Sequence, residues 1–370
     1  MSARVFIYVQ HLLGIGHLVR SNRIAEALRD AGFAVTMAIG GAPVKGFPGP
    51  GLNIVSLPPV KAGAEGFSSL VDGAGNPIDD TFKAARRDLL VNAFRAAKPD
   101  ILIVESFPFG RRAMRFELLP LLEAARAMPN RPLIATSVRD ILQATSKPGR
   151  AEETVQTIET YFDLVLVHGD PSFAALGETF PLASTITKEI FHTGLVAGPL
   201  PPVPQDHYDI VVSAGGGAAG FALMRAAAQM IRQFNGSHRC CLITGPNLGQ
   251  AETFKGMDVF TFRPDFPSLL RGARLSISQA GYNTICDILR VGCRSLLIPF
   301  AAGGETEQTE RAMKLKKLGL ADVLLEADIN AATLAAVVER LLAAPPPPIN
   351  TLNLDGAERT ARFLKDRFKA

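Results

Sequence analysis

The sequence of 370 residues has no tryptophan, few cysteines and no long hydrophobic run. The cysteines are Cys240, Cys241, Cys286 and Cys293. They form no CxxC pair, which argues against a zinc ribbon and against a disulfide framework. No apolar run approaches the roughly 18 residues that a membrane-spanning helix needs, and residues 1–20 indicate a strand rather than a signal peptide. We therefore expect a soluble protein of a reducing, cytoplasmic compartment.

A large excess of one charge is also missing. Lysine and arginine number 39 and aspartate and glutamate 35, which gives a net charge of +4. Polyanion-binding proteins concentrate basic residues on a face or in a tail, so we expect no nucleic acid partner. The sequence contains no Gly-Lys dipeptide, HExxH, GxSxG or DxD. These absences exclude a Walker A loop and lead us to predict no metal and no cofactor.

Hydrophobic residues make up 47% of the chain and charged residues 20%, which is enough to build cores. Short β-branched runs alternate with helical patterns from end to end, as is typical of parallel βαβ units. The first series of predicted strands is 4–10, 34–39, 100–106, 132–138 and 162–169. The second series begins at residue 209 and continues at 239–245, 258–262, 274–279 and 294–300. We predict an α/β protein with two Rossmann-like domains and parallel sheets.

Two proline clusters mark the expected boundaries. Residues 198–206 (GPLPPVPQD) hold four prolines in nine residues. Since proline fixes φ and cannot join a central ladder, this segment indicates a stiff linker, the alternative being a long surface loop. We predict one domain at 1–198 and a second at 207–344. After PPPP (345–348), residues 349–370 predict a helix that packs back on the first domain or lies at the periphery.

Three strand-to-helix turns are rich in glycine, at residues 13–17, 215–218 and 279–284. In open α/β sheets, ligands bind beyond the carboxyl ends of strands, where helix N-termini present amides. Residues 215–220 satisfy GxGxxG, but a dinucleotide site also needs an acid at the end of the second strand. Neither domain has one, so we predict no NAD and a phosphate held by backbone amides. Any one turn is equally compatible with a tight structural connection.

The segment 262–312 carries the most specific pattern. It contains a strand end, a glycine turn at Gly281, a helix with Asp287 one turn inside, and a strand that ends in proline. Asp287 is placed where it can face a bound ribose. Glu307 and Gln308 open the next helix, where they can reach ribose or sugar hydroxyls.

With these motifs the sequence resembles the GT-B glycosyltransferases, and among them glycosyltransferase family 28, which includes the N-acetylglucosaminyltransferases that make peptidoglycan lipid II. The resemblance implies parallel sheets of two Rossmann-like domains that face across a cleft, with the acceptor in the first domain and the nucleotide-sugar donor in the second. It also implies a metal-independent, inverting hexosyl transfer from a nucleotide-diphosphate sugar, UDP-linked, to an acceptor hydroxyl of unknown identity.

The resemblance further implies roles for single residues. Phe262 and Arg263 match the uridine-binding position, Asp287 the ribose-binding acid, and Glu307 with Gln308 the family's glutamine pair. The remaining implied donor-binding residues lie in the glycine turns, and they are Gly14, Gly16, Gly216, Gly217, Ala218, Gly281, Tyr282, Asn283 and Thr284.

Three departures from the family pattern leave other functions open. Asp287 stands where the family usually has glutamate, Glu307 replaces a glutamine, and the first turn lacks a doubled glycine before His17. Residues 16–20 (GHLVR) are instead similar to the GHxxR of the nucleotide-sugar hydrolase in pseudaminic acid synthesis. The alternatives are therefore a nucleotide-sugar hydrolase or epimerase on the same scaffold, and a non-catalytic nucleotide-sugar sensor.

Glycosyl transfer needs a base for the acceptor hydroxyl, and His17 is the predicted one. A helix N-terminus lowers the pKa of an imidazole and favours the neutral form that a base requires. The alternative is that His17 caps the helix or binds the acceptor without moving protons. Acceptor-site candidates at strand ends are Glu105, Arg139 and Asp140, although each is as apt to cap or pair locally.

Residues 107–122 combine phenylalanines with arginines. This composition suggests a weak peripheral contact with anionic lipid. The alternative is an ordinary helix with a solvated charged face.

Overall fold

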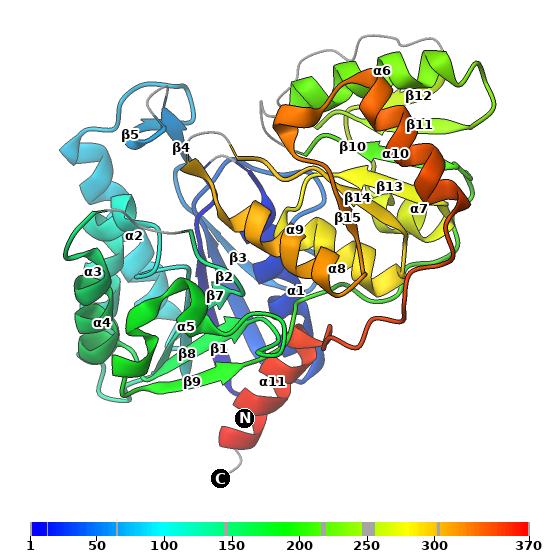
Figure 1. Ribbon diagram of the computed structural model, residues 1–370. Coiled ribbons are helices and arrows are strands. Elements are labelled where there is room, and N and C mark those ends of the chain that lie inside the picture. The colour runs from blue at the N-terminus through cyan, green and yellow to red at the C-terminus, as the bar shows by residue number, and fades with distance from the viewer. Residues whose placement is uncertain are drawn as a thin grey trace. The chain divides into compact units, whose positions relative to one another are not determined.

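The computed structural model (Figure 1) describes residues 2–12, 14–63, 66–143, 147–215, 220–245, 256–301 and 304–368. By its internal contacts the chain divides into two compact units. The N-terminal unit comprises residues 1–196 and 355–370, and the C-terminal unit comprises residues 197–354.

A parallel sheet in the order β3-β2-β1-β6-β7-β8-β9 forms the centre of the N-terminal unit. Its strands are β1 (Arg4–Val9), β2 (Ala34–Ile39), β3 (Asn53–Ser56), β6 (Ile101–Glu105), β7 (Leu133–Arg139), β8 (Leu164–His168) and β9 (Glu189–His192). Strands β6 and β8 are buried at every position, which explains their unbroken apolar sequence. The strand order reverses at β1, so ligands are expected beyond the carboxyl ends of β1 and β6.

Helices cover both faces of this sheet (Figure 1). They are α1 (Gly16–Asp30), α2 (Asp80–Ala97), α3 (Arg115–Arg126), α4 (Arg150–Tyr161), α5 (Leu176–Thr179) and α11 (Gly356–Arg367), with 3-10 turns η1 (Arg112–Met114) and η2 (Pro181–Thr185). Phe6 of β1 packs edge-to-face on Phe94 of α2, in a core that also takes residues of α3 and α4. On the other face α11 packs against α1, and Phe363 stacks on Phe191.

An antiparallel hairpin, β4 (Val60–Gly63) and β5 (Gly66–Asp72), lies outside the parallel sheet. The Ala62 amide donates to the Leu12 carbonyl at 3.1 Å, which attaches the hairpin to the loop after β1. The sequence analysis missed this hairpin and the edge strands β3 and β9, because short half-exposed strands lack a strong apolar run.

The C-terminal unit repeats the architecture with a parallel sheet in the order β12-β11-β10-β13-β14-β15. Its strands are β10 (Ile210–Ser213), β11 (Cys240–Ile243), β12 (Met257–Phe260), β13 (Leu275–Ser278), β14 (Ser295–Leu297) and β15 (Asp322–Val323). Its helices are α6 (Phe221–Gln233), α7 (Phe266–Gly272), α8 (Tyr282–Val291), α9 (Glu307–Lys317) and α10 (Ala331–Ala343), with the 3-10 turn η5 (Glu326–Asp328). The order reverses at β10, next to β13. The predicted α/β fold with parallel sheets is confirmed.

The basic and aromatic segment 107–122 is engaged within the N-terminal unit. Phe107 is fully buried. Arg112 donates to the Arg150 carbonyl at 2.6 Å, and Arg115 pairs with Glu153 of α4. These contacts favour the structural alternative over a lipid-binding face. Among the described helices none is long and apolar enough to cross a membrane.

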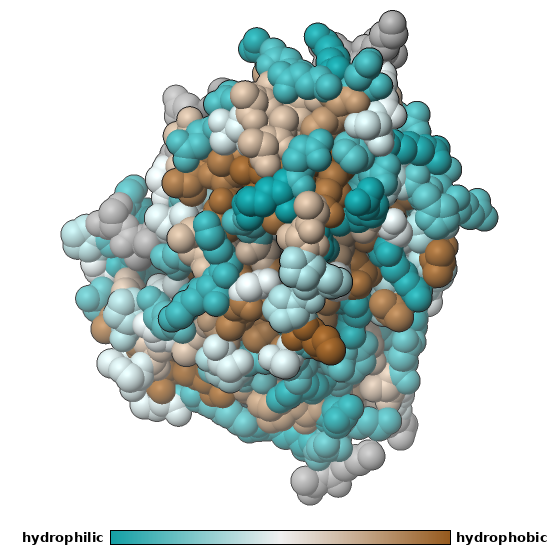
Figure 2. All heavy atoms as spheres, turned by 45° about the vertical axis from the view of Figure 1, so that its right-hand side comes forward, coloured by the Kyte–Doolittle hydropathy of each residue, from teal (hydrophilic) through white to brown (hydrophobic). Residues whose placement is uncertain are grey.

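The surface exposes hydrophobic as well as hydrophilic residues, as expected for a chain with 47% hydrophobic residues. On the face shown in Figure 2, hydrophobic side chains are interspersed with hydrophilic ones.

Candidate active site

Two loops meet where the strand order of the N-terminal unit reverses. Residues 10–15 follow β1 and lead into α1, while residues 106–111 follow β6. β1 and β6 are neighbours in the sheet, so their carboxyl ends lie side by side. Gly14, Gly16 and His17 belong to the first loop and helix start, and Glu105 is the last residue of β6.

His17 and Glu105, which the sequence analysis assigned to different roles, are hydrogen-bonded to each other. His17 Nδ1 lies 2.7 Å from Glu105 Oε1, and Arg20, one turn along α1, pairs with the same oxygen. Glu105 is fully buried, whereas 19% of the His17 side chain is exposed. No side chain caps the N-terminus of α1, so His17 is not used as its cap. The geometry therefore shows an oriented histidine–glutamate pair.

The protonation states of this pair follow from its surroundings. Burial lowers the pKa of His17 to about 3. Glu105 acts to raise this pKa, but Arg111 and Arg20 offset part of that increase. Burial alone would raise the pKa of Glu105, but His17, Arg20 and Arg111 hold it at about 2. Glu105 is thus a carboxylate that can only accept, so His17 Nδ1 carries the proton and donates. The His17 Nε2 lone pair, with no described hydrogen-bond partner, is left available as a base.

A second buried histidine lies two strands away from Glu105. His168 Nδ1 is 2.9 Å from the Thr193 hydroxyl and Nε2 is 2.8 Å from the Ser137 hydroxyl. Thr193 donates its hydrogen to the Gly194 carbonyl, so it accepts from His168 Nδ1–H, and Ser137 then donates to Nε2. Burial lowers the pKa of His168 to about 3. Both ring nitrogens of His168 are hydrogen-bonded and the ring is fully buried, which indicates a structural role.

The other acceptor-site candidates, Arg139 and Asp140, lie at the carboxyl end of β7. Arg139 pairs in register with His168 of β8, and Asp140 is fully buried. Both take part in further interactions. Arg139 acts electrostatically on Arg111, which places it in the same polar region as His17.

A buried charge network supports the loop after β1, and the sequence analysis missed it. Arg86 of α2 donates to Glu117 Oε2 at 2.6 Å and to Gln10 Oε1 at 2.6 Å. Tyr8 donates to Glu117 Oε1 at 2.5 Å. A Cβ on Gly40 would lie 2.0 Å from Gln10 Oε1, so only glycine fits against this network. The alternation of charged residues on α2 resembles that of any amphipathic helix, so no sequence signal distinguishes Arg86.

The C-terminal unit presents glycine turns where its strand order reverses. Gly215 follows β10 with φ of +74°, and a Cβ there would lie 2.4 Å from Gln279 Oε1. Gly281 is the N-cap residue of α8, without a side-chain cap and with open space where a Cβ would stand. Tyr282, Asn283 and Thr284 form the first turn of α8. The predicted phosphate-contacting residues Gly216, Gly217 and Ala218 lie outside the described residues.

The acidic and amide side chains of the predicted donor site are buried or hydrogen-bonded within the C-terminal unit. Asp287 is buried on α8. Glu307, expected to reach sugar hydroxyls, is also buried and accepts from Arg311 Nη2 at 2.8 Å. Arg311 donates in turn to the Ala280 carbonyl at 3.1 Å, which links α9 to the glycine turn. Gln308 Oε1 accepts from the Phe300 amide at 3.2 Å.

Phe262 and Arg263 follow β12. The Phe262 side chain is exposed, so its ring is accessible to a planar ligand. Arg263 donates to Asp265 at 2.7 Å and to Asp206 at 3.0 Å. The hydrogen bonds to Asp265 raise the pKa of Arg263 further. The guanidinium of Arg263 is therefore held by two carboxylates, which leaves the Arg263 backbone for contact with a nucleotide base.

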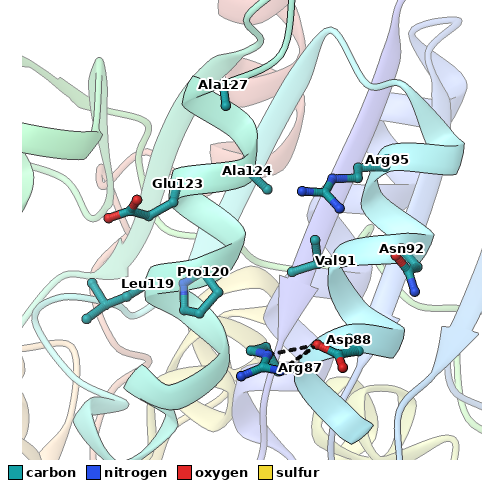
Figure 3. A pocket seen from close by; sticks show the side chains of 10 residues that line it. All are labelled: Arg87, Asp88, Val91, Asn92, Arg95, Leu119, Pro120, Glu123, Ala124 and Ala127. Carbon is teal, nitrogen blue, oxygen red and sulfur yellow. Dashed lines mark hydrogen bonds and ion pairs between the residues drawn. The ribbon is translucent and has the colours of Figure 1, made fainter. Parts of the chain in front are cut away.

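A hollow on the outer surface of the N-terminal unit involves none of these residues. It is a groove of about 670 Å³ between α2 and α3. Figure 3 shows Val91 facing Ala124 at its centre, with Arg95 at one end and Arg87 beside Asp88 at the other. Among the described residues no cluster of three or more His, Cys, Asp or Glu side chains could hold a metal ion.

Comparison with known proteins shows a family match in the C-terminal part of the chain. Residues 211–357 match the glycosyltransferase family 28 C-terminal domain. The UDP-N-acetylglucosamine–N-acetylmuramyl-(pentapeptide) pyrophosphoryl-undecaprenol N-acetylglucosamine transferase of Bartonella tribocorum is 26% identical over 153 residues, 39% of this chain and 40% of the relative. The enzyme of that name from Leuconostoc citreum is 28% identical over 149 residues, 37% of this chain and 40% of the relative. The chain thus spans about two fifths of the length of these relatives.

Solved structures with the same fold cover nearly the whole chain. The glycotransferase of kitacinnamycin has a TM-score of 0.64 and 13% identity, with 99% of both chains covered. The calicheamicin glycosyltransferase CalG4 has a TM-score of 0.60 and 17% identity, covering 100% of this chain and 95% of that one. MurG of Acinetobacter baumannii has a TM-score of 0.58 and 14% identity, with 99% of both covered. At these identities the likeness establishes the GT-B fold alone.

Proposed function

We propose that the protein is a glycosyltransferase, because residues 211–357 match the C-terminal domain of glycosyltransferase family 28 and the chain has the GT-B fold. It moves a sugar from a nucleotide-diphosphate sugar to an acceptor hydroxyl. The observation that carries the proposal is the His17–Glu105 pair, with a neutral imidazole whose Nε2 has no described partner. Transfer rather than hydrolysis is supported by the relatives, which are named as transferases.

In the proposed mechanism His17 Nε2 takes the proton of the acceptor hydroxyl as its oxygen attacks the anomeric carbon. Glu105 accepts from Nδ1–H and stabilises the imidazolium that forms, while Arg20 neutralises the buried carboxylate. The bond from the anomeric carbon to the diphosphate breaks on the opposite face, so the configuration inverts. A well-placed hydrogen-bond donor stabilises a developing negative charge by roughly 3 kcal/mol.

The C-terminal unit is proposed to hold the donor. Backbone amides at the start of α8 and at Gly215 receive the diphosphate without a metal ion. Asp287 contacts the ribose, Phe262 and Arg263 the base, and Gln308 the sugar. Glu307 is proposed to act through Arg311, which fixes the turn by its bond to Ala280. The donor named in both relatives is UDP-linked, which supports a UDP-sugar here.

Donor binding is tested first, by thermal shift of the full chain with UDP, TDP, GDP and their sugars. A nucleotide at 100 times its Kd stabilises a protein by about 2.7 kcal/mol, so a cognate nucleotide should raise Tm clearly. No shift with any of them would refute the proposed function. Free sugar released from the donor without an acceptor would instead assign the hydrolase alternative.

Turnover is then followed as nucleoside diphosphate released in the presence of an acceptor panel. His17→Ala should lower the transfer rate by about 10²- to 10⁴-fold and keep the nucleotide-induced shift, because only the base is lost. Glu105→Gln should also lose most activity, since an amide no longer selects the Nδ1–H tautomer. His207→Ala, an exposed histidine of the C-terminal unit, is the control and should retain full activity. Wild-type turnover by His17→Ala would remove His17 from this role, and chelators should leave activity unchanged.

A further inference from the structure

Gln10 is the first residue after β1, and its side chain is fully buried. Its Nε2 donates to the His11 carbonyl at 2.9 Å and to the Val60 carbonyl at 3.0 Å, and its Oε1 accepts from Arg86 Nη2 at 2.6 Å. Because carbonyls only accept and a guanidinium only donates, these partners fix which end of the amide carries the nitrogen. Both amide hydrogens are used. Ionised glutamate has the same length but offers no donor, and neither does methionine, so these contacts require glutamine.

Four segments of the N-terminal unit converge on Gln10. Val60 is the first residue of β4, and Arg86 comes from α2. Arg86 also donates to the Gly40 carbonyl, directly after β2, at 3.1 Å. The Gln10 carbonyl accepts at 2.8 Å from Nε of Arg111, which lies in the loop after β6. Gln10 therefore joins the loop after β1 to the hairpin of β4 and β5, to α2, and to the loops after β2 and β6.

The loop that begins at Gln10 leads to the start of α1, where the candidate base His17 lies. Glu105 holds the His17 ring through Nδ1, but this bond does not fix the backbone of the loop. No side chain caps the N-terminus of α1. The Ala62 amide donates to the Leu12 carbonyl, which ties the loop to the same hairpin that Gln10 contacts. The course of the loop, and with it the burial of His17, therefore depends on the contacts made at Gln10.

We propose that Gln10 is a positioning residue of the transferase site: its side-chain amide holds the loop after β1 against the hairpin and thereby keeps His17 buried beside Glu105, in place for the acceptor hydroxyl. Since Gln10 is fully buried, it acts through His17 rather than by contact with substrate. A misplacement of about 1 Å in a reacting group can lower a rate about 10²-fold. This inference rests on the proposed function, because it concerns the base of the same site.

The first test is the pKa of His17, measured by NMR titration of the full chain, with its signal identified by its loss in His17→Ala. Burial is the main cause of this low pKa of about 3. Gln10→Met has a similar length but lacks both donors, so the loop should loosen, water should reach the ring, and the pKa should rise toward 6.5. The charged groups that act on His17 from α1, β6 and the loop after β6 are unchanged in this variant, and they are Arg20, Glu105 and Arg111.

Thr360→Val is the matched control. Thr360 is equally buried in the same unit, and its hydroxyl donates to the Gly356 carbonyl of its own helix α11. Its loss removes a buried hydrogen bond without touching the loop after β1, so the pKa of His17 should stay at the wild-type value. Gln10→Glu is a second variant, which keeps the acceptor for Arg86 but loses both donors while ionised. It should raise the pKa of His17 as Gln10→Met does.

The wild-type protein provides a measurement that needs no variant. The two Nε2 hydrogens of Gln10 are buried and bonded to carbonyls, so they should exchange with solvent much more slowly than the side-chain amide of the exposed Asn92.

The catalytic readout uses the acceptor that the transfer assay identifies. Gln10→Met should lower kcat by about 10- to 100-fold and move the acid limb of the kcat profile to higher pH, because the base is displaced and more easily protonated. The Kd for UDP should stay at the wild-type value, since the proposed nucleotide site is in the C-terminal unit. A role in stability alone would leave kcat and the acid limb of the folded variant unchanged.

An unchanged pKa of His17 in folded Gln10→Met would overturn the inference and leave the proposed function intact. Solvent exchange of the Gln10 amide as fast as that of Asn92 would overturn it as well. A raised pKa of His17 in a protein that binds none of UDP, TDP and GDP would instead refute the proposed function, while the positioning of His17 by Gln10 would stand.

Discussion

The two units have the same order of parallel strands, but different groups lie where that order reverses. Where the strand order of the N-terminal unit reverses, polar side chains form the candidate site, since the neutral His17 and the guanidinium of Arg20 both contact the buried carboxylate of Glu105. At the corresponding position of the C-terminal unit, glycines expose the backbone at Gly215 and Gly281. An ion pair of this unit, Glu307 with Arg311, supports the turn through the Ala280 carbonyl.

This difference follows from what each proposed site has to bind. A diphosphate is recognised by amides that point in one direction, and a β-carbon near them would obstruct its approach. Proton transfer needs an imidazole of defined tautomer, which only other side chains can impose. The N-terminal unit should therefore be sensitive to the loss of charges and the C-terminal unit to the gain of a methyl group.

The largest effect is expected when the charge network beneath the β1 loop is broken. Arg86→Met leaves Glu117 buried without its partner, which should lower the free energy of unfolding of the N-terminal unit by about 3–5 kcal/mol. Arg87→Gln next to it removes an exposed pair and should change it by about 0–1 kcal/mol. Urea denaturation measures both variants. Equal stability of the two would show that the buried network does not support this unit.

The next largest effect is expected at acidic pH, where two largely buried histidines of the N-terminal unit, His17 and His168, should lower the stability of the folded protein. The pKa values of His17 and His168 are lowered to about 3 by burial, so the native state stays unprotonated while the unfolded chain takes up protons below pH 6.5. Stability is therefore full above pH 6.5 and falls as the pH decreases toward 3. The loss is at most about 1.4 kcal/mol per pH unit for each histidine.

His168→Asn removes one of these two protonation sites. Between pH 6 and 4 its free energy of unfolding should therefore fall less steeply than that of wild type, by about 1.4 kcal/mol per pH unit at most. Urea titrations at several pH values provide the slopes. A variant slope identical to that of wild type would show that His168 is not neutral in the folded protein.

The smallest effect concerns a methyl group in the C-terminal unit. Gly215→Ala and Gly292→Ala both place alanine at positive φ and should each cost about 1–2 kcal/mol. Only the first brings a Cβ within 2.4 Å of Gln279 Oε1, whereas the space at Gly292 is open. UDP affinity, measured by calorimetry, should therefore fall in Gly215→Ala alone. Equal affinities of the two variants would place the nucleotide away from this turn.

The sequence was most informative where its signal is local. The alternation of apolar runs and helical stripes predicted the parallel sheets, and the runs at 100–106 and 162–169 correspond to the buried strands β6 and β8. The hairpin of β4 and β5 escaped prediction because short half-exposed strands have no run of this kind. Gly215 and Gly281 were identifiable because glycine between a strand and a helix is itself a backbone signal.

His17 was predicted from its position at a helix start, but its partner was not. Glu105 is separated from it by 88 residues, and only the neighbouring placement of β1 and β6 brings the two side chains together. Arg86 and Arg311 were missed for the same reason, since Arg86 donates to Gln10 and Arg311 to the Ala280 carbonyl, both on other elements.

The sequence alone predicted the two series of βαβ units and the glycine turns, because apolar periodicity and backbone freedom are properties of neighbouring residues. The partners of the buried groups Glu105 and Arg86 were decided by the tertiary structure. A charge is stabilised by whatever lies within a few ångströms in space, and sheet order, which no local pattern encodes, determines which distant residues those are.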